Sequence, residues 1–350
     1  MLTATYKKHT LFFRKPAGTS RGILQAKNSY FIFISDTHLP GITGVGECSI
    51  IPGLSPDDRP ELEEMLSHVI IDISLTWENR NEIRASWPGI ITGIEMAMTD
   101  LKNGGIRVLF PSPFTEGNHA IPIHGLIWMG NTATMLQQID EKLNNGFKVI
   151  KMKIGTLAFE EELNLIKYIR QHFNNREIEI RLDANEAFSL SEALEKMKRL
   201  AEFSIHSVEQ PIRRGQPEAM AELCRKSPVP IALDEELIGL SDDSAKLRLL
   251  EMIRPHYIII KPSLLGGFES SDLWIKQAEK VGSGWWITSA LESDIGLNAI
   301  AQWTITLDNP LVQGLGTGSL FKNNIPSPLM VLNGGLCYNT GKTWDFSSIV

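Results

Sequence analysis

The chain has 350 residues, of which 43% are hydrophobic and 21% are charged, a composition typical of a globular protein. Its net charge of −7 argues against nucleic acid or an anionic membrane as a partner. The three cysteines lie far apart, so neither a disulfide framework nor a zinc site is indicated, and a cytoplasmic location is expected. No apolar run has the length of a membrane span or of a signal-peptide core.

Residues 1 to about 52 alternate between β-rich and turn-rich pieces. The expected strands are 11–13, 30–34 and 45–51. They predict a small antiparallel sheet with two exposed loops, 15–22 and 36–44. Because exposed loops often carry binding residues, Arg21 is a candidate contact for an anionic group of a substrate.

Helical signals follow from residue 55 to about 102. The segment 55–58, SPDD, is typical of a helix start and has Asp58 at the capping-box position. Four apolar residues recur at helical spacing further on: Ile91, Ile94, Met98 and Leu101. We therefore predict two or more helices packed on the sheet. Turn residues over 103–117 then predict that residues 1–118 form an α+β capping domain.

Beyond residue 118, short apolar strands alternate with amphipathic helices, which indicates a parallel sheet. The expected strands are 121–129, 148–154, 177–183, 205–209, 231–234, 257–261, 285–289 and 312–315. Eight strands in about 200 residues favour a closed (β/α) barrel over 119–321. An open doubly wound sheet is the alternative, but it would want a glycine-rich phosphate loop after the first strand, and 128–134 is not one.

Polar residues stand at the ends of six successive expected strands. They are Lys153, Asp183, Glu209, Asp234, Lys261 and Ser289, at spacings of 30, 26, 25, 27 and 28 residues. Each spacing is one strand–helix unit, a phase that random charges would not keep. Because catalytic groups of such barrels lie at the C-terminal ends of the strands, we expect these side chains to converge.

Three of these residues are carboxylates on neighbouring strands, which lie about 4.8 Å apart. Converging anions repel one another unless a cation lies between them. Oxygen ligands without histidine or cysteine favour Mg²⁺, with Mn²⁺ as a substitute. The pattern therefore predicts a metal site at Asp183, Glu209 and Asp234.

Lys153 and Lys261 are predicted to face each other across this metal, because the second and sixth strands of eight are opposite. Lys151 shares a strand face with Lys153. Desolvation and a like-charged neighbour lower a lysine pKa, so we expect a neutral amine that can act as a base. This arrangement suits removal of a proton α to a carboxylate, with the metal stabilising the enediolate.

Several motifs carry a resemblance to a known family. They are KMK at 151–153, DAN at 183–185, EQP at 209–211, LDE at 233–235 and IKPSLLGG at 260–267. Together they resemble the enolase superfamily and, within it, the muconate-lactonising subgroup. The resemblance covers nearly the whole chain and implies a modified (β/α)8 barrel, (β/α)7β, with the cap completed by about 322–350. The mandelate-type branch would have a histidine at the end of strand seven, where this chain reads ITSALES.

Three activities of the subgroup compete. The segments 19–22, 289–296 and 314–321 most resemble the enzymes that form o-succinylbenzoate in menaquinone biosynthesis. This resemblance implies a syn-dehydration of 2-succinyl-6-hydroxy-2,4-cyclohexadiene-1-carboxylate. Lys153 would take the α-proton and return it to the leaving hydroxyl, while Lys261 stays cationic.

The resemblance also implies supporting roles for four residues. Lys151 and Asn185 would support the centre, and Ser263 and Ser289 would contact the succinyl tail or cap the following helices. An N-succinylamino acid racemase or dipeptide epimerase remains an alternative, although 314–320 lacks the acidic pair usual in dipeptide epimerases. Muconate cycloisomerase, a non-catalytic barrel and a homo-oligomer also remain open.

Overall fold

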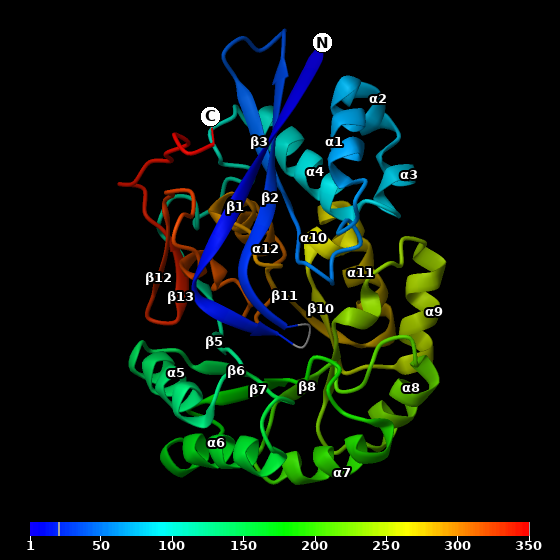
Figure 1. The fold of residues 1–350 in the computed structure, drawn as a ribbon, viewed down its shortest axis with the longest axis vertical. Coiled ribbons are helices and arrows are strands. Elements are labelled where there is room, and N and C mark those ends of the chain that lie inside the picture. The colour runs from blue at the N-terminus through cyan, green and yellow to red at the C-terminus, as the bar shows by residue number, and fades with distance from the viewer. Residues whose placement is uncertain (20–21, 350) are drawn as a thin grey trace.

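The N-terminal part of the chain is an antiparallel sheet covered on one face by helices (Figure 1). The computed structural model describes residues 1–19 and 22–349. The sheet order is β1-β2-β3, with β1 (Leu2–Thr19), β2 (Gly22–Asp36) and β3 (Thr43–Ser49). The helices are α1 (Leu62–Ile71), α2 (Ile73–Glu78), α3 (Arg80–Arg84) and α4 (Pro88–Lys102). We call these strands and helices the cap.

The cap confirms the predicted antiparallel sheet and corrects two details. Residues 15–19 are not a loop, because β1 runs to Thr19 and pairs with β2 beyond a register shift. The first helix begins at Leu62 instead of near residue 55, and Asp58 Oδ2 accepts the Gly53 N–H at 2.7 Å, closing a turn. Arg21 lies outside the described residues.

The four apolar residues predicted at helical spacing lie on α4, which packs against β2 and β3. Ile91, Ile94 and Leu101 are buried, and Met98 is half-buried against the same core. Gly46 of β3 faces this helix so closely that an added Cβ would meet the Gly93 carbonyl oxygen. Glycine at these positions lets the helix and the sheet approach each other.

The rest of the chain is built around a parallel sheet, in the order β11-β10-β9-β8-β7-β6-β5. Its strands are β5 (Gly125–Ile127), β6 (Val149–Lys153), β7 (Glu179–Asp183), β8 (Ser207–Glu209), β9 (Ile231–Leu233), β10 (Tyr257–Ile260) and β11 (Gly284–Ile287). The predicted eighth strand, 312–315, forms only two bridges, Ile123↔Gln313 and Thr288↔Gly314. Because these bridges reach both edges of the sheet, the segment closes the barrel.

Helices surround the barrel strands (Figure 1). They are α5 (Thr132–Asn144), α6 (Phe159–His172), α7 (Leu190–Ala201), α8 (Pro217–Lys226), α9 (Asp243–Ile253), α10 (Pro262–Leu265), α11 (Gly267–Val281) and α12 (Asp294–Ile305), with single 3-10 turns at Glu235–Leu237 and Thr317–Leu320. Apolar strand residues such as Ile150, Ile180 and Val208 pack in one core with these helices, and Ala232, Ile259 and Trp286 form a separate cluster. Within the described ranges, no helix is long and apolar enough to cross a membrane.

The C-terminal residues contact both parts of the molecule. β12 (Leu329–Leu332) and β13 (Gly335–Tyr338) form a small sheet with β4 (Ile121–Pro122), so the predicted strand 121–129 is divided between β4 and β5. Further on, Phe346 and Ile349 pack on the outer face of the cap sheet. The exact domain division, 1–118 with 322–350 against 119–321, stays a prediction.

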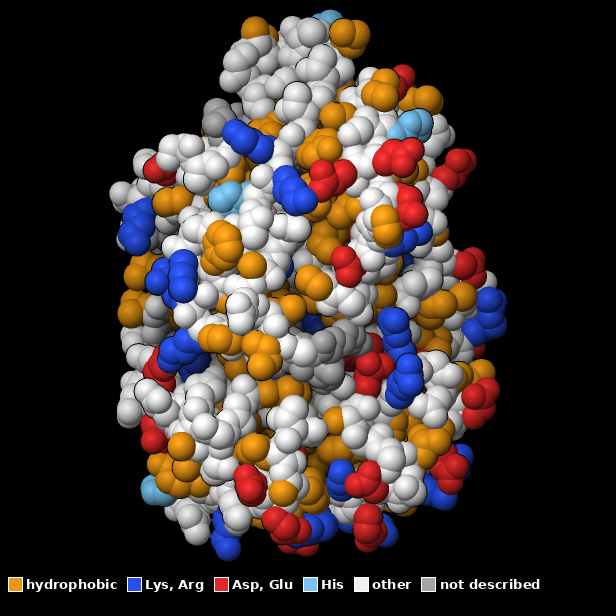
Figure 2. Space-filling view, viewed as in Figure 1, with side chains coloured by type: hydrophobic (Ala, Val, Ile, Leu, Met, Phe, Trp, Pro, Cys, Tyr) orange, Lys and Arg blue, Asp and Glu red, His pale blue; other side chains and the backbone are white. Residues whose placement is uncertain are grey.

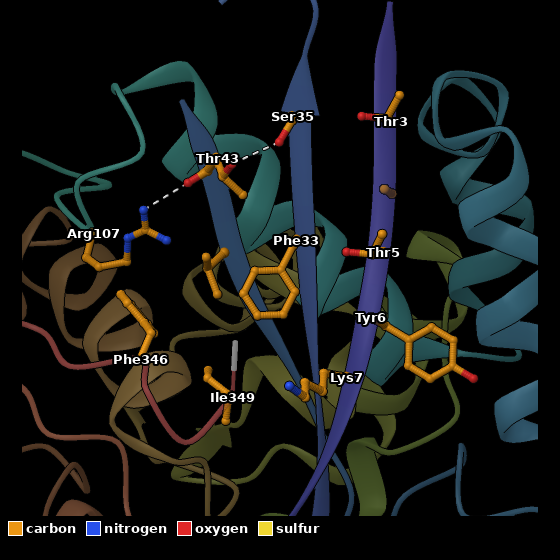
Figure 3. Close-up of a pocket in the computed structure, with 12 residues that line it drawn as sticks. Thr3, Thr5, Tyr6, Lys7, Phe33, Ser35, Thr43, Arg107, Phe346 and Ile349 are labelled. Atoms are coloured by element: carbon orange, nitrogen blue, oxygen red, sulfur yellow. Dashed lines mark hydrogen bonds between the residues drawn. The ribbon is translucent and has the colours of Figure 1, made fainter. Parts of the chain in front are cut away.

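This outer face of the cap holds a groove of about 540 Å³ (Figure 3). Side chains of β1, β2 and β3 line one side, and Phe346 and Ile349 line the other. Arg107 closes one end and donates to the Thr43 carbonyl oxygen at 2.8 Å. Among the described residues of the predicted site, none lines this groove.

Candidate active site

The C-terminal ends of the barrel strands open into a cavity of about 450 Å³ between the barrel and the cap. Ala17 of the β1–β2 hairpin, with Ile51 and Leu54 of the cap, covers it with apolar surface. Lys153 and Lys261, the two predicted catalytic lysines, both line this cavity. Figure 2 shows hydrophobic side chains in the middle of the molecule, below the cap.

The strand register brings the predicted polar residues to one level. Lys153 is the Cα partner of Asp183, and Asp183 is the partner of Glu209. Lys151 Nζ lies 3.0 Å from Asp183 Oδ2 and 2.7 Å from Glu209 Oε2. Lys153 Nζ lies 3.1 Å from Asp183 Oδ2.

Across the barrel, Lys261 forms an ion pair with Asp234. Burial disfavours the Lys261 ammonium, but the carboxylates of Asp234 and Glu209 outweigh it and raise the pKa of Lys261 above its ordinary value. Lys261 is therefore cationic at neutral pH, as expected.

The electrostatics of the other residues depend on how their charges are paired. Burial disfavours the Lys151 ammonium, yet the carboxylates of Asp183 and Glu209 raise the pKa of Lys151. The Lys151 ammonium is therefore matched by two buried carboxylates. Burial acts upward on Asp183 as well, but the ammonium groups of Lys151 and Lys153 hold its pKa below its usual range.

Glu209 is the carboxyl group that the neighbouring negative charges affect most. Burial and the negative charge of Asp183 raise the pKa of Glu209 well above its usual value, even though Lys151 is bonded to it. A divalent cation would relieve that repulsion. The donor set is all carboxylate oxygen, which is the ligand type that Mg²⁺ prefers.

In this structure the carboxylates of Asp183, Glu209 and Asp234 form ion pairs with the lysines. Over residues 1–19 and 22–349, no three aspartate, glutamate, histidine or cysteine side chains surround one point closely enough to hold a metal ion. The chemistry of Asp183, Glu209 and Asp234 fits Mg²⁺, and binding would require their oxygens to turn from the ammonium groups.

Asn185 supports this centre. Its Oδ1 accepts from Lys153 Nζ, and its Nδ2 donates to Glu235 Oε1 at 3.2 Å. Asn185 and Gln210, which follow β7 and β8, have φ of 42° and 37°. Left-handed backbone at non-glycine residues is uncommon and clusters at functional sites.

The predicted serines take different places. Ser289 lines the cavity, and its Oγ lies 2.7 Å from Thr317 Oγ1. Ser263 is fully buried, is not among the cavity-lining residues, and donates to Glu292. Ser263 therefore holds the segment after β11 instead of facing the cavity.

The cavity-lining residues that sequence reasoning missed include Trp128, Glu235 and His124. The Trp128 ring lies 5.7 Å from Lys153 Nζ. Glu235 follows Asp234 directly and bonds to Asn185. His124 is buried, and no described residue bonds to its Nδ1. The doubled acid in ALDEE was a usable signal for Glu235, whereas Trp128 and His124 have no periodic pattern.

Comparison with known proteins agrees with this geometry. Residues 134–341 match the family model described as Enolase C-terminal domain-like. The chain is 43% identical to o-succinylbenzoate synthase from Desulfotalea psychrophila, with 95% of this chain and 97% of that protein covered. The chain belongs to the o-succinylbenzoate synthase family of the enolase superfamily.

Solved structures support the fold of the enolase superfamily. The crystal structure of MenC from Desulfotalea psychrophila LSv54 superposes with a TM-score of 0.85 at 39% identity, covering 96% of this chain and 99% of that one. A dipeptide epimerase from Cytophaga hutchinsonii, complexed with Mg and the dipeptide D-Ala-L-Val, has a TM-score of 0.83 at 20% identity, with 99% and 97% covered. At 20% identity the similarity to the epimerase supports the fold alone.

Proposed function

We propose that this chain catalyses the Mg²⁺-dependent syn-dehydration of 2-succinyl-6-hydroxy-2,4-cyclohexadiene-1-carboxylate to o-succinylbenzoate, a step of menaquinone biosynthesis. The observation that carries the proposal is one cavity lined by Lys153 and Lys261 in a chain 43% identical to an o-succinylbenzoate synthase. The substrate is a small carboxylate, in keeping with a cavity whose centre is lined by ammonium groups.

Asp183, Glu209 and Asp234 are the residues that would hold Mg²⁺, or Mn²⁺ in its place. When bound, the ion would neutralise the charge that develops on the substrate carboxylate as the α-proton leaves. Relatives of this fold bind Mg, as the epimerase from Cytophaga hutchinsonii does. Release of the lysines from these carboxylates would free Lys153 to lose its proton.

Lys153 is the base and then the acid. Its amine takes the α-proton, and the C–H electron pair is delocalised onto the substrate carboxylate as an enediolate. The resulting ammonium gives that proton to the hydroxyl on the same face, the C–O bond breaks, and water leaves. Lys261 stays cationic on the opposite face and stabilises the negative charge of the intermediate. Asn185 and Lys151 hold Lys153 and its carboxylate partner in place.

One assay separates this proposal from the racemase and cycloisomerase alternatives. The purified chain is given the cyclohexadiene carboxylate, an N-succinylamino acid and a muconate in separate reactions with Mg²⁺. We expect kcat/KM for dehydration to exceed the other two by at least about 100-fold, or about 2.7 kcal/mol in transition-state binding. Faster racemisation or lactonisation than dehydration would replace the proposal by that activity.

A further inference from the structure

A second cluster of buried charges lies where the cap meets the segment that follows β11. Lys27 of β2, Glu47 of β3 and Glu292 of that segment are 3%, 0% and 0% exposed. None of them lines the catalytic cavity, and the proposed reaction uses none of them. Buried charges are rare unless they are fully bonded, so their partners show what the cluster does.

The Lys27 ammonium is satisfied without water. Its Nζ donates to Ser29 Oγ at 3.1 Å, to Ser49 Oγ, and to the Leu291 carbonyl oxygen at 2.7 Å. These three bonds use all three hydrogens of the ammonium. One of them crosses from the cap to the barrel and ends on the backbone of a cavity-lining residue, Leu291.

Glu47 holds the same segment two residues further along. Its carboxylate accepts from Ser293 N at 2.9 Å, from Ser293 Oγ and from Gly296 N at 3.0 Å. It also accepts from Ser29 Oγ at 2.6 Å, which joins it to the Lys27 bonds. Cap side chains therefore hold the backbone on both sides of Glu292.

Leu291, which lies between these two holds, has a φ of 60°. A leucine in the left-handed region is strained, and such strain persists only where the surroundings over-determine the backbone. The Leu291 side chain lines the cavity and belongs to the same apolar cluster as Ile51, Leu54 and Trp128. Its conformation therefore sets part of the cavity wall.

We propose that Lys27 and Glu47 are positioning residues of the substrate cavity, which hold the segment 289–293 so that Leu291 forms its wall. Two cap side chains that touch no substrate thereby set the space for the part of the substrate away from Lys153 and Lys261. The inference rests on the proposed function only in taking this cavity as the substrate site.

The test is a double-mutant cycle between Lys27→Met and Leu291→Ala, read as KM and kcat for dehydration. Lys27→Met removes the bond to the Leu291 carbonyl and keeps most of the side-chain stem. We expect it to raise KM about tenfold with kcat within about threefold. In the Leu291→Ala background, the same substitution changes KM less than about twofold, because the wall it positions is already gone.

Asp100→Asn is the matched control. Asp100 is equally buried, accepts from Val45 N and Arg107 N at 2.9 and 2.8 Å, and forms its ion pair with Arg107 and no hydrogen bond with 289–293. It should lower the melting temperature and leave KM unchanged. If Lys27→Met does not fold, Ser49→Ala replaces it, with an expected KM rise of about threefold, because Ser49 Oγ donates to the Ala290 carbonyl at 3.2 Å.

An unchanged KM in the folded Lys27 or Ser49 variant, or an equal rise in Asp100→Asn, overturns the inference.

Amide exchange over 289–296 provides a readout that needs no substrate. We expect faster exchange there in the Lys27 or Ser49 variant and not in Asp100→Asn, and unchanged exchange also overturns it. If the unaltered chain neither turns over nor binds o-succinylbenzoate, the proposed function fails, and amide exchange still decides whether the cap holds this segment.

Discussion

The chain buries two clusters of charge, and they are satisfied in different ways. At the strand ends, ammonium groups of Lys151, Lys153 and Lys261 pair with carboxylates beside a cavity. At the seam between cap and barrel, Lys27 and Glu47 bond to hydroxyl groups and backbone. Ion pairs beside a cavity can exchange partners with a ligand, whereas charges saturated by backbone are fixed. The first cluster is therefore suited to proton transfer on a bound substrate, and the second is suited to holding the backbone of 289–293 in place.

Loss of the strand-end base should have the largest effect. Lys153→Ala removes the group proposed to move the proton, so we expect kcat for dehydration to fall by about 10³- to 10⁴-fold. The melting temperature should change little, because Lys153 packs at the cavity instead of in the core. Activity within tenfold of the unaltered chain would contradict the role of Lys153.

Lys261→Ala should have the next largest effect and separates two mechanisms. A dehydratase loses electrostatic stabilisation, and we expect kcat to fall by about 10²- to 10³-fold. An enzyme that uses both lysines as bases would lose proton exchange on one face only. Exchange of substrate or product protons in D₂O, followed by NMR, distinguishes the two.

Glu95 of α4 is a third buried charge between the cap and the barrel, and its effect on stability depends on pH. It accepts from Phe268 N and, at 3.0 Å, from Glu269 N, and burial raises its pKa from 4.5 to about 7. The folded state therefore binds more protons than the unfolded state between these pH values, so stability falls as pH rises through this window. The loss is about 3 kcal/mol.

Urea unfolding of the unaltered chain and of Glu95→Gln at pH 5 and pH 8 measures this effect. The unaltered chain should lose about 2.5 kcal/mol of unfolding free energy relative to the variant between the two pH values. A difference that does not change with pH would show that Glu95 is ionised at no cost.

A helix cap remote from both clusters should have the smallest effect. Asp242 Oδ2 accepts from Ala245 N at 2.7 Å at the start of α9. Asp242→Ala should lower the melting temperature slightly and leave kcat and KM unchanged. A change in KM here would mean that general destabilisation alters the cavity, and the KM readout for Lys27 would lose its meaning.

The strand-end cluster could be predicted because the barrel repeats one strand–helix unit and puts each strand end at the same level. Lys153, Asp183 and Glu209 therefore kept a readable spacing in the sequence. The seam cluster could not be predicted, since Glu47 and Ser293 are 246 residues apart and belong to no repeat. Their pairing depends on how the cap docks.

Two local errors have different origins. Asp58 has the spacing of a helix cap, but a turn that includes Gly53 takes its carboxylate. The segment 312–315 has the pattern of a strand, but it closes the barrel with single bridges at Gln313 and Gly314. A competing local turn decides the first case, and contacts with Ile123 and Thr288 decide the second.

A crystal structure of the chain with Mg²⁺ and o-succinylbenzoate tests the central claim most directly. We predict one ion at about 2.0–2.1 Å from oxygens of Asp183, Glu209 and Asp234, with the product between the amines of Lys153 and Lys261. An ion held elsewhere, or a product that contacts neither lysine, would contradict the account.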